Sequence, residues 1–187
     1  MSSLRSRIED LDDQVDGWFL RLRGNRVADR VFYTASTLGE FGLVWVMIAL
    51  VRALRGRPND ERSAVRAIVA SVVESLIVNA GLKSVFKRRR PLVQVEHPYP
   101  FRQPLTSSFP SGHATAAFCS ATLLADGDDL APLYYAAAAV VAASRVHVRI
   151  HHASAVLGGA LIGLVLGRIG RALAPLPDPP VKGIRSR

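Results

Sequence analysis

Histidine, arginine and lysine residues gather in three short stretches of a mostly apolar chain of 187 residues. The stretches are 83–91 (KSVFKRRRP), 110–113 (PSGH) and 144–155 (SRVHVRIHHASA). Arginine makes paired hydrogen bonds to phosphate oxygens, and lysine adds a point charge. Together the stretches indicate chemistry on a phosphate group, and the apolar surroundings favour a phosphate carried by a lipid.

The stretch 110–113 has the features of an anion-binding helix start. Ser111 is a natural N-cap, and Gly112 lets the backbone approach a ligand closely. The free N–H groups at a helix start attract anions. His113 would then lie beside a bound phosphate, where it could protonate a leaving oxygen. An ordinary capped helix with an interfacial histidine explains the same four residues.

In the third stretch Arg145 precedes His151 by six residues. Arg145 could hold phosphate oxygens while His151 attacks phosphorus, forming a phosphohistidine and splitting the displacement into two steps. Such a histidine needs its far ring nitrogen held, normally by a carboxylate. The natural place for that carboxylate is position 155, one helical turn further on, and this residue is alanine.

Simpler explanations compete for parts of the pattern. Lys83 and Arg90 are seven residues apart, so a continuing helix would place them on one face, and Pro91 would end that helix. Alone, this cluster is typical of a juxtamembrane site for anionic lipid heads. The three histidines of the third stretch suggest a metal site, but no carboxylate or cysteine lies nearby to complete one. We therefore place a metal site well below a phosphate site, and we expect no cofactor.

The composition favours a membrane protein over a nucleic-acid-binding protein. The net charge is +9, the pI is about 10.7, 49% of the residues are hydrophobic and the mean hydropathy is +0.20. The arginines cluster at the ends of apolar segments, where anionic lipid headgroups are met. Aromatic and basic residues do not alternate as they do in proteins whose aromatic side chains stack on nucleic-acid bases, so we expect no nucleic-acid partner. A single cysteine, Cys119, excludes an internal disulfide and a thiolate metal cluster.

Apolar segments predict an all-α, integral-membrane helical bundle with about five transmembrane helices. The segments are 31–51, 65–86, 112–125, 131–148 and 153–173. Gly159 and Gly163 form a GxxxG spacing, which lets helices approach closely in lipid. Two carboxylates inside the segments, Glu40 and Glu74, are best explained by a hydrogen bond to a neighbouring helix or by partial solvation, although a functional role is also open.

Residues 1–27 contain an amphipathic helix, with apolar residues at spacings of three and four. This helix is predicted to lie in the membrane interface, to pack on the rest of the protein, or both. We assign 1–174 to a single domain and 175–187 to a basic, proline-rich, disordered tail.

If each apolar segment crosses the membrane once, all three stretches emerge on the same face. Outside the stretches, six arginines lie on that face and ten cationic residues lie on the other. The six are Arg5, Arg7, Arg21, Arg23, Arg26 and Arg30; the ten are Arg52, Arg55, Arg57, Arg62, Arg66, Arg168, Arg171, Lys182, Arg185 and Arg187. The excess favours a cytoplasmic location for the second face and an outward-facing site.

The stretches resemble the signature of the type 2 phosphatidic acid phosphatase (PAP2) superfamily, K-x6-RP, PSGH and SR-x5-H-x3-D. Every position but the last, Ala155, matches in order and spacing. The resemblance implies an all-helical fold, a site at one membrane face and no metal. It also implies that His151 is the nucleophile and His113 the general acid. The phosphate-binding residues that it implies are Lys83, Arg90, Ser111, Gly112 and Arg145.

We therefore expect a phosphatase of the bacterial plasma membrane that acts on a lipid phosphate monoester or diphosphate. Candidate substrates are a polyprenyl (di)phosphate, a prenyl-linked sugar phosphate and a phosphatidyl phosphate. The arginine- and alanine-rich composition suggests a compact bacterial member, for which a polyprenyl-phosphoryl-pentose phosphate of cell-wall arabinan synthesis is a candidate by analogy. The alternative is a non-catalytic membrane protein that binds lipid phosphates or acts as a scaffold. A soluble-type haloperoxidase is a weaker third possibility.

The alanine at position 155 has three explanations. It is an inactivating substitution, or another group such as Glu96 or a water orients His151, or the protein is a natural pseudoenzyme that binds without turnover. The intact surrounding motif favours the first explanation. Loss of an orienting carboxylate can cost orders of magnitude in rate, so the sequence predicts slow or absent turnover.

Overall fold

The computed structural model describes residues 2–91, 99 and 106–177, in which the regular elements are all helical. In chain order they are α1 (Ser2–Leu20), α2 (Arg26–Leu38), η1 (Glu40–Gly42), α3 (Leu43–Leu54), α4 (Asp60–Leu76), η2 (Ile77–Leu82), α5 (Lys83–Val85), α6 (Gly112–Leu124), α7 (Ala131–His147) and α8 (Ala153–Leu173). The all-α prediction is confirmed for this part of the chain. Glu96 and most of the predicted tail, from 178 onward, lie outside the described residues.

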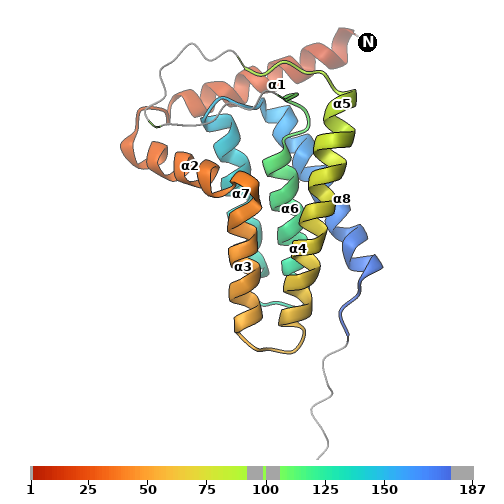
Figure 1. The fold of residues 1–187 in the computed structure, drawn as a ribbon. Coiled ribbons are helices and arrows are strands. Elements are labelled where there is room, and N and C mark those ends of the chain that lie inside the picture. The colour runs from red at the N-terminus through yellow and green to blue at the C-terminus, as the bar shows by residue number, and fades with distance from the viewer. Residues whose placement is uncertain (1, 92–98, 100–105, 178–187) are drawn as a thin grey trace, which may run out of the picture.

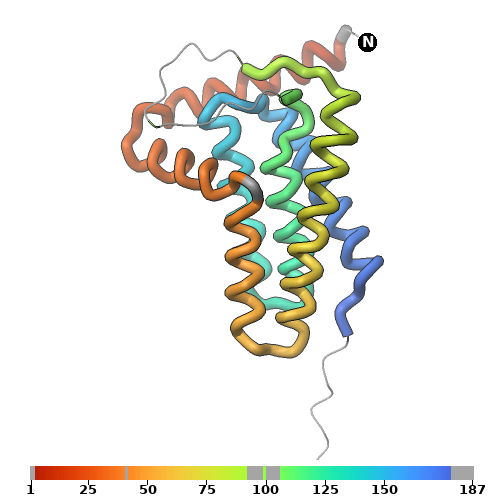
Figure 2. The backbone as a smooth tube through the Cα atoms, viewed as in Figure 1, coloured from red at the N-terminus to blue at the C-terminus, as the bar shows by residue number. Residues whose placement is uncertain are grey.

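The longer helices run side by side along one axis, while α1 lies across one end of the bundle (Figure 1). The chain passes away from α1 in α3, returns in α4, η2 and α5, leaves again in α6, returns in α7 and leaves in α8 (Figure 2). The end of α5, the start of α6 and the α7–α8 turn therefore meet at the same end, which we call the α1 end. The three sequence stretches lie there, as counting the apolar segments predicted. The opposite end is called the far end.

Two helical stretches of the described chain are long and apolar enough to cross a membrane, Asp60–Val85 and Ala153–Leu173. Helices α2 and α3 would form a third span if they are counted together, but they are bent by 78° at the break between them. Helices α6 and α7 have 13 and 17 residues, fewer than the ~20 that a span needs. The bundle is that of an integral membrane protein, and the predicted number of five spans stays a prediction.

Helix α1 packs on the bundle through part of its apolar face. Val15 and Phe19 lie against the buried cluster of α6, α7 and α8. Leu4 and Trp18 of the same helix are 66% and 59% exposed. The predicted packing of this helix is thus present, and the exposed apolar residues leave its predicted place in the membrane interface open.

Helices α6 and α8 touch through their backbones. A Cβ atom added at Gly159 would lie 2.5 Å from the Ser111 carbonyl oxygen, and one added at Gly163 would lie 2.3 Å from the Thr115 carbonyl oxygen. Both distances are shorter than real Cβ contacts, so only glycine fits. The GxxxG spacing therefore sets the distance between α8 and the helix that carries the PSGH turn.

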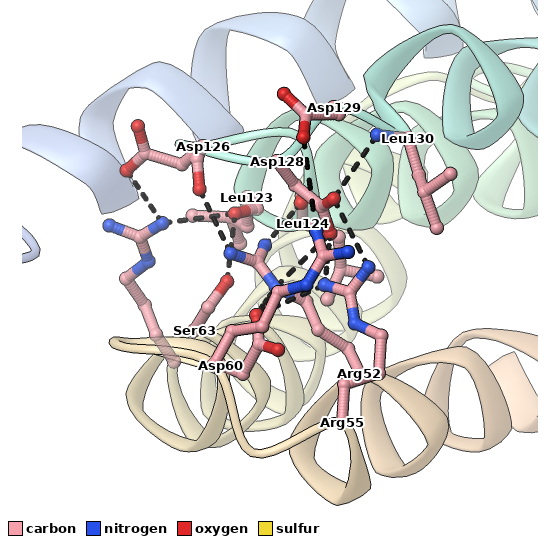
Figure 3. A network of polar contacts seen from close by, with 12 residues as sticks. Arg52, Arg55, Asp60, Ser63, Leu123, Leu124, Asp126, Asp128, Asp129 and Leu130 are labelled. Atoms are coloured by element: carbon pink, nitrogen blue, oxygen red, sulfur yellow. Dashed lines mark hydrogen bonds and ion pairs between the residues drawn. The ribbon is translucent and has the colours of Figure 1, made fainter.

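Buried arginines hold the far end of α6 (Figure 3). Arg52, which is 2% exposed, donates from Nε to Asp60 at 2.9 Å and from Nη1 to the Leu124 carbonyl. Arg66 Nη2 donates to the Leu123 carbonyl at 2.9 Å. Leu123 and Leu124 are the last residues of α6, whose final carbonyls have no partner within the helix. The arginines supply these partners and tie α6 to α3 and α4.

Asp128 completes the network in the α6–α7 turn. It pairs with Arg55 (Figure 3). It also accepts a hydrogen bond from the Tyr134 hydroxyl at 2.6 Å. Burial alone raises the pKa of Asp128, but hydrogen bonds from Arg55 and Tyr134 outweigh it and hold the pKa well below its usual value. A carboxylate with a lowered pKa stabilises the fold at neutral pH, and this contribution is lost only as the pH falls through that lowered pKa.

The glycine contact predicts that Gly163→Ala destabilises the bundle. The added methyl group meets backbone atoms of α6 that cannot move alone, and overpacking of this kind costs roughly 1–3 kcal/mol. Thermal unfolding in detergent measures the effect. The matched control is Gly17→Ala in α1, where a Cβ would meet nothing within 4 Å and alanine should be neutral or stabilising. Equal melting temperatures for the two variants would contradict the proposed close contact.

Candidate functional site

The helix carrying Lys83 ends earlier than the sequence predicted. After the π-helical segment η2 the chain forms the short α5 and stops at Val85, and Phe86 has an extended backbone (φ −94°, ψ 105°). Lys83 and Arg90 therefore do not share a helix face, and the prediction of a continuing helix up to Pro91 was wrong. The physical reason is a competing set of contacts: the backbone of Arg88 is hydrogen-bonded to residues 107–108 instead of to α5.

Arg90 links this segment to the other stretches. All five of its N–H donors have acceptors, namely the Thr106 carbonyl (3.0 Å) and hydroxyl (3.3 Å), the Ser107 carbonyl (3.2 Å), the Ile150 carbonyl (2.8 Å) and His151 Nε2 (3.2 Å). Arg90 thus holds the loop before the PSGH turn against the α7–α8 turn. A phosphate bound by Arg90 would have to replace one of these contacts.

The PSGH turn begins α6 as the sequence predicted. Ser111 is the N-cap, and its Oγ accepts a hydrogen bond from the Ala114 N–H at 3.5 Å. Lys83 reaches this turn, since a Cβ added at Gly112 would lie 3.3 Å from the lysine Nζ. Nε2 of His113 is buried and has no hydrogen-bond partner among the described residues. A buried polar atom without a partner is costly, and a bound oxyanion would satisfy it.

Arg145 lies in the last turn of α7 and is 1% exposed. Its Nη1 atom donates to the Ser36 hydroxyl of α2. Its Nε atom is buried and finds no partner in the described part of the chain. Arg145 and His113 therefore each present a buried nitrogen without a partner among the described residues at the α1 end, where an anion could be bound.

His151 is held in one tautomer by a backbone carbonyl. Its Nδ1 lies 2.7 Å from the Ser108 carbonyl oxygen, and because that oxygen can only accept, Nδ1 must carry the proton. Nε2 is then free to accept the hydrogen bond from Arg90 Nη1 at 3.2 Å. Burial, followed by the positive charges of Arg90 and Arg145, holds the pKa of His151 well below its ordinary value of 6.5. The structure therefore presents a neutral imidazole with a lone pair at Nε2, and His113 lies within its electrostatic reach.

Ser108 supplies the acceptor that Ala155 lacks. Ala155 is fully buried, and its own carbonyl accepts from the Ser111 N–H at 3.1 Å, which ties α8 to the PSGH turn. Sequence reasoning missed Ser108, because a backbone carbonyl leaves no signature in the residue type. Glu96, which the sequence offered as a substitute, lies outside the described residues.

The remaining histidines of the third stretch have structural partners. Nε2 of His147 lies 2.8 Å from Asp29 Oδ1 of α2, and the His147 ring packs against Phe32 with centroids 4.6 Å apart. His152 is the N-cap residue of α8, and its Nδ1 lies 4.0 Å from Asp12 Oδ2. Within the described residues no group of three or more histidine, cysteine, aspartate or glutamate side chains could hold a metal ion.

An apolar groove of about 740 Å³ lies between α4 and α8. Val65, Val69, Leu166 and Ile169 are among the residues that line it. Glu74, which is 4% exposed, lines the part of the groove toward the α1 end, and its carboxyl interacts electrostatically with Lys83. Glu74 Oε1 has no hydrogen-bond partner among the described residues, so the interhelical hydrogen bond expected for this carboxylate is not seen there.

Comparisons with known proteins give one consistent result. The sequence pattern of the PAP2 superfamily matches residues 64–175. The chain is 31% identical over 140 residues, 72% of its length and 73% of the relative's, to decaprenylphosphoryl-5-phosphoribose phosphatase of Mycobacterium tuberculosis, in strains CDC 1551 and H37Rv alike.

Solved structures share the fold. A transmembrane PAP2-type phosphatidylglycerolphosphate phosphatase from Bacillus subtilis superposes with a TM-score of 0.69 at 20% identity, over 92% of this chain and 87% of its own. LpxE from Aquifex aeolicus superposes with a TM-score of 0.68 at 24% identity, over 87% of this chain and 93% of its own. The matched pattern, which covers more than half of the chain, and the 31% identical relative show that this protein belongs to the PAP2 superfamily.

Proposed function

We propose that this protein is an active integral-membrane phosphatase that hydrolyses a lipid phosphate through a phosphohistidine on His151. The observation that carries the proposal is the hydrogen bond between His151 Nδ1 and the Ser108 carbonyl at 2.7 Å. It leaves the Nε2 lone pair facing Arg90, where a phosphorus atom could be attacked. The slow turnover that the sequence predicted remains untested, and this hydrogen bond supports the opposite expectation.

The proposed reaction has two displacements. His151 Nε2 attacks phosphorus, a P–N bond forms, and the P–O bond to the lipid breaks as His113 gives a proton to the leaving oxygen. A water molecule, deprotonated by His113, then attacks the phosphohistidine, and the P–N bond breaks to release inorganic phosphate. The proton on Nδ1 stays in place throughout, hydrogen-bonded to Ser108.

Phosphate binding is assigned to groups around the two histidines. Arg145 offers its unpaired Nε, and Lys83 lies against Gly112. Arg90 can transfer its Nη1 contact from His151 to a phosphate oxygen. The N–H groups after Ser111 add a helix N-terminus. Such donors, fixed before the substrate arrives, stabilise the charge of the transition state without reorganising.

The proposed substrate is a prenyl-linked sugar phosphate. The curated relative at 31% identity is named for decaprenylphosphoryl-5-phosphoribose, whose terminal phosphate is a monoester. The groove between α4 and α8 offers an apolar surface whose lining extends from Glu61 toward the α1 end as far as Ile77, six residues before Lys83. We place the substrate's tail there. Polyprenyl diphosphates and phosphatidyl phosphates are the competing substrates.

We also propose that the protein lies in the bacterial plasma membrane with the α1 end facing outward. The support is the excess of cationic residues at the far end. Several of these residues are already paired with aspartates of the same end, Arg52, Arg55, Arg66 and Arg171 among them. The effective excess is therefore smaller than the sequence count suggests.

Phosphate release from a substrate panel tests the function. The panel contains a short-chain prenyl-phosphoryl ribose 5-phosphate, a prenyl diphosphate and a phosphatidic acid. We expect release to be fastest with the first and to fall at least ~10³-fold in His151→Ala, which lacks the nucleophile. Release equal to that of His151→Ala on all three, together with retained lipid binding, would show a binding protein without turnover.

Substrates with different leaving groups test whether His113 is the general acid. We expect His113→Ala to lose most activity on the lipid substrates, whose alkoxide leaving groups need a proton. It should retain far more activity on p-nitrophenyl phosphate, whose leaving group needs none. Equal losses on both substrate types would contradict the assignment of His113 as the general acid.

Restoring the family's carboxylate tests the role of Ser108. Because the carbonyl already orients His151, we expect Ala155→Asp to raise kcat by no more than about threefold, whereas an absent orienting group can be worth ~10⁴. Ala155→Asn, which has the same size without the charge, is the control for crowding at this buried position. A gain of two orders of magnitude in Ala155→Asp alone would mean that the Ser108 carbonyl is insufficient.

The pH dependence of kcat/KM reports the environment of His151. The pKa of His151 is held well below 6.5 by burial and by Arg90 and Arg145. His151 therefore stays neutral at acidic pH, and kcat/KM should fall only at correspondingly low pH, on the acid limb of the pH profile. In Arg90→Met one of these charges is lost, the pKa rises and the acid limb should move to higher pH. The substrate ionises identically in both proteins, so the difference belongs to the enzyme. An unmoved limb would contradict the electrostatic coupling.

A further inference from the structure

We propose that Asp12, in the N-terminal helix α1, is a positioning residue of the active site. Its carboxylate binds Arg88 after α5 and the first turn of α8, the two segments that fix the position of His151. Asp12 thereby takes over part of the orienting role that the family's aspartate would have at position 155. The inference rests on the proposed function of this site and names a residue outside its three motifs.

Asp12 contacts α8 at its first turn. The carboxylate is 6% exposed, and its Oδ1 accepts from the Ser154 N–H at 2.7 Å, across 142 residues of sequence. Its Oδ2 accepts from the Ser154 hydroxyl at 2.8 Å. His152, the N-cap residue, makes no capping bond with its own side chain. Asp12 therefore caps α8 from another helix, where the helix dipole favours negative charge.

The same carboxylate binds the segment after α5. Its Oδ2 accepts from Arg88 Nη2 at 2.6 Å, and Arg88 Nη1 donates to the Ser154 hydroxyl at 2.7 Å. The three side chains form a closed set of charge-assisted hydrogen bonds that is partly shielded from water, in which such bonds are strong. Asp12 thus joins the first motif to the third.

Arg88 passes this constraint to the orienting carbonyl. The Arg88 carbonyl accepts from the Ser108 N–H at 2.9 Å, and the Arg88 N–H donates to the Ser107 hydroxyl at 3.1 Å. The peptide that holds His151 Nδ1 is therefore fixed through the Arg88 backbone, and the Arg88 side chain is fixed by Asp12. On the other side, Ser154 follows His151 by three residues, so capping α8 limits where the imidazole can lie.

Asp16 strengthens the attachment one turn along α1. It pairs with Arg23 at 2.6 Å and with Arg149 of the α7–α8 turn at 3.3 Å. Arg149 has a left-handed backbone (φ 56°), which a non-glycine residue adopts only when its surroundings hold it there. Helix α1 therefore contacts the turn carrying His151 through two carboxylates, and Asp12 is the one that also reaches Arg88.

The first test is kinetic. We expect Asp12→Ala to lower kcat about 10- to 100-fold, as a small misplacement of reacting groups does, with KM changed less than about threefold because the phosphate-binding groups are untouched. Arg88→Met should cause a similar loss, and the double variant should lose little more than either single variant, because both break one chain of contacts. The matched control is Asp13→Asn, an exposed neighbour on the same helix, which should keep wild-type kcat and KM.

The second test needs no turnover. In histidine-labelled protein the ¹⁵N resonances of a protonated and an unprotonated imidazole nitrogen are far apart, and a His151→Gln spectrum assigns the His151 signals. We expect wild type and Asp13→Asn to show one tautomer with the proton on Nδ1, and Asp12→Ala to show a mixture.

The outcomes separate the two proposals. If wild type releases no phosphate above His151→Ala, the proposed function fails and the tautomer spectra still decide the role of Asp12. An unchanged tautomer in Asp12→Ala would overturn the inference, even if that variant unfolds at a lower temperature, because lowered stability alone would show only a structural role.

Discussion

The hydrogen bond from His151 Nδ1 to the Ser108 carbonyl is the interaction on which the site depends. A histidine can attack phosphorus only with a neutral ring whose lone pair faces the substrate, and this bond sets both the tautomer and the direction of the ring. Each partner is fixed by backbone contacts. The Ser108 N–H is held by the Arg88 carbonyl, and the His151 N–H donates to the Arg145 carbonyl at 3.1 Å.

Arginines serve opposite purposes at the two ends of the bundle. At the far end Arg52 and Arg55 form ion pairs with Asp60 and Asp128 (Figure 3). These ion pairs hold α3, α4 and the α6–α7 turn together. At the α1 end Arg145 is 1% exposed and makes no ion pair within 4 Å among the described residues, although the charge of Glu40 acts on it from further away. It lies beside imidazoles whose charged form its own charge opposes. Buried charge of this kind is costly unless something of opposite sign completes it. A phosphate group, which binds and then leaves, suits this requirement.

The position of the site could be predicted from the sequence, because it depends on the number of helical passes and on residue types with strong local preferences. Two examples are Ser111, which caps α6, and Gly163 of α8, which lets α8 pack closely on α6. The end of α5 at Val85 could not be predicted, since it depends on backbone contacts with residues 107–108, which are distant in sequence. The bend between α2 and α3 was also missed, although Gly42, with φ of 70°, allows it.

The orienting groups lay beyond sequence reasoning for a different reason. A carbonyl such as that of Ser108 belongs to every residue, so its use depends on the path of the chain. Asp12 and Asp13 are the same residue type on the same helix, and only the packing of α1 makes one buried and the other exposed. The family motif indicated which carboxylate was absent at position 155, but it could not indicate that His151 Nδ1 is hydrogen-bonded to the Ser108 carbonyl.

A structure of the protein with orthovanadate, which mimics a phosphoryl group in transfer, tests the convergence of these side chains most directly. We expect vanadium bonded to His151 Nε2, vanadate oxygens in contact with Arg145 Nε and His113 Nε2, and Nδ1 still hydrogen-bonded to Ser108. Vanadate bound away from His151, or bonded to it through Nδ1, would show that these side chains do not form one phosphate site.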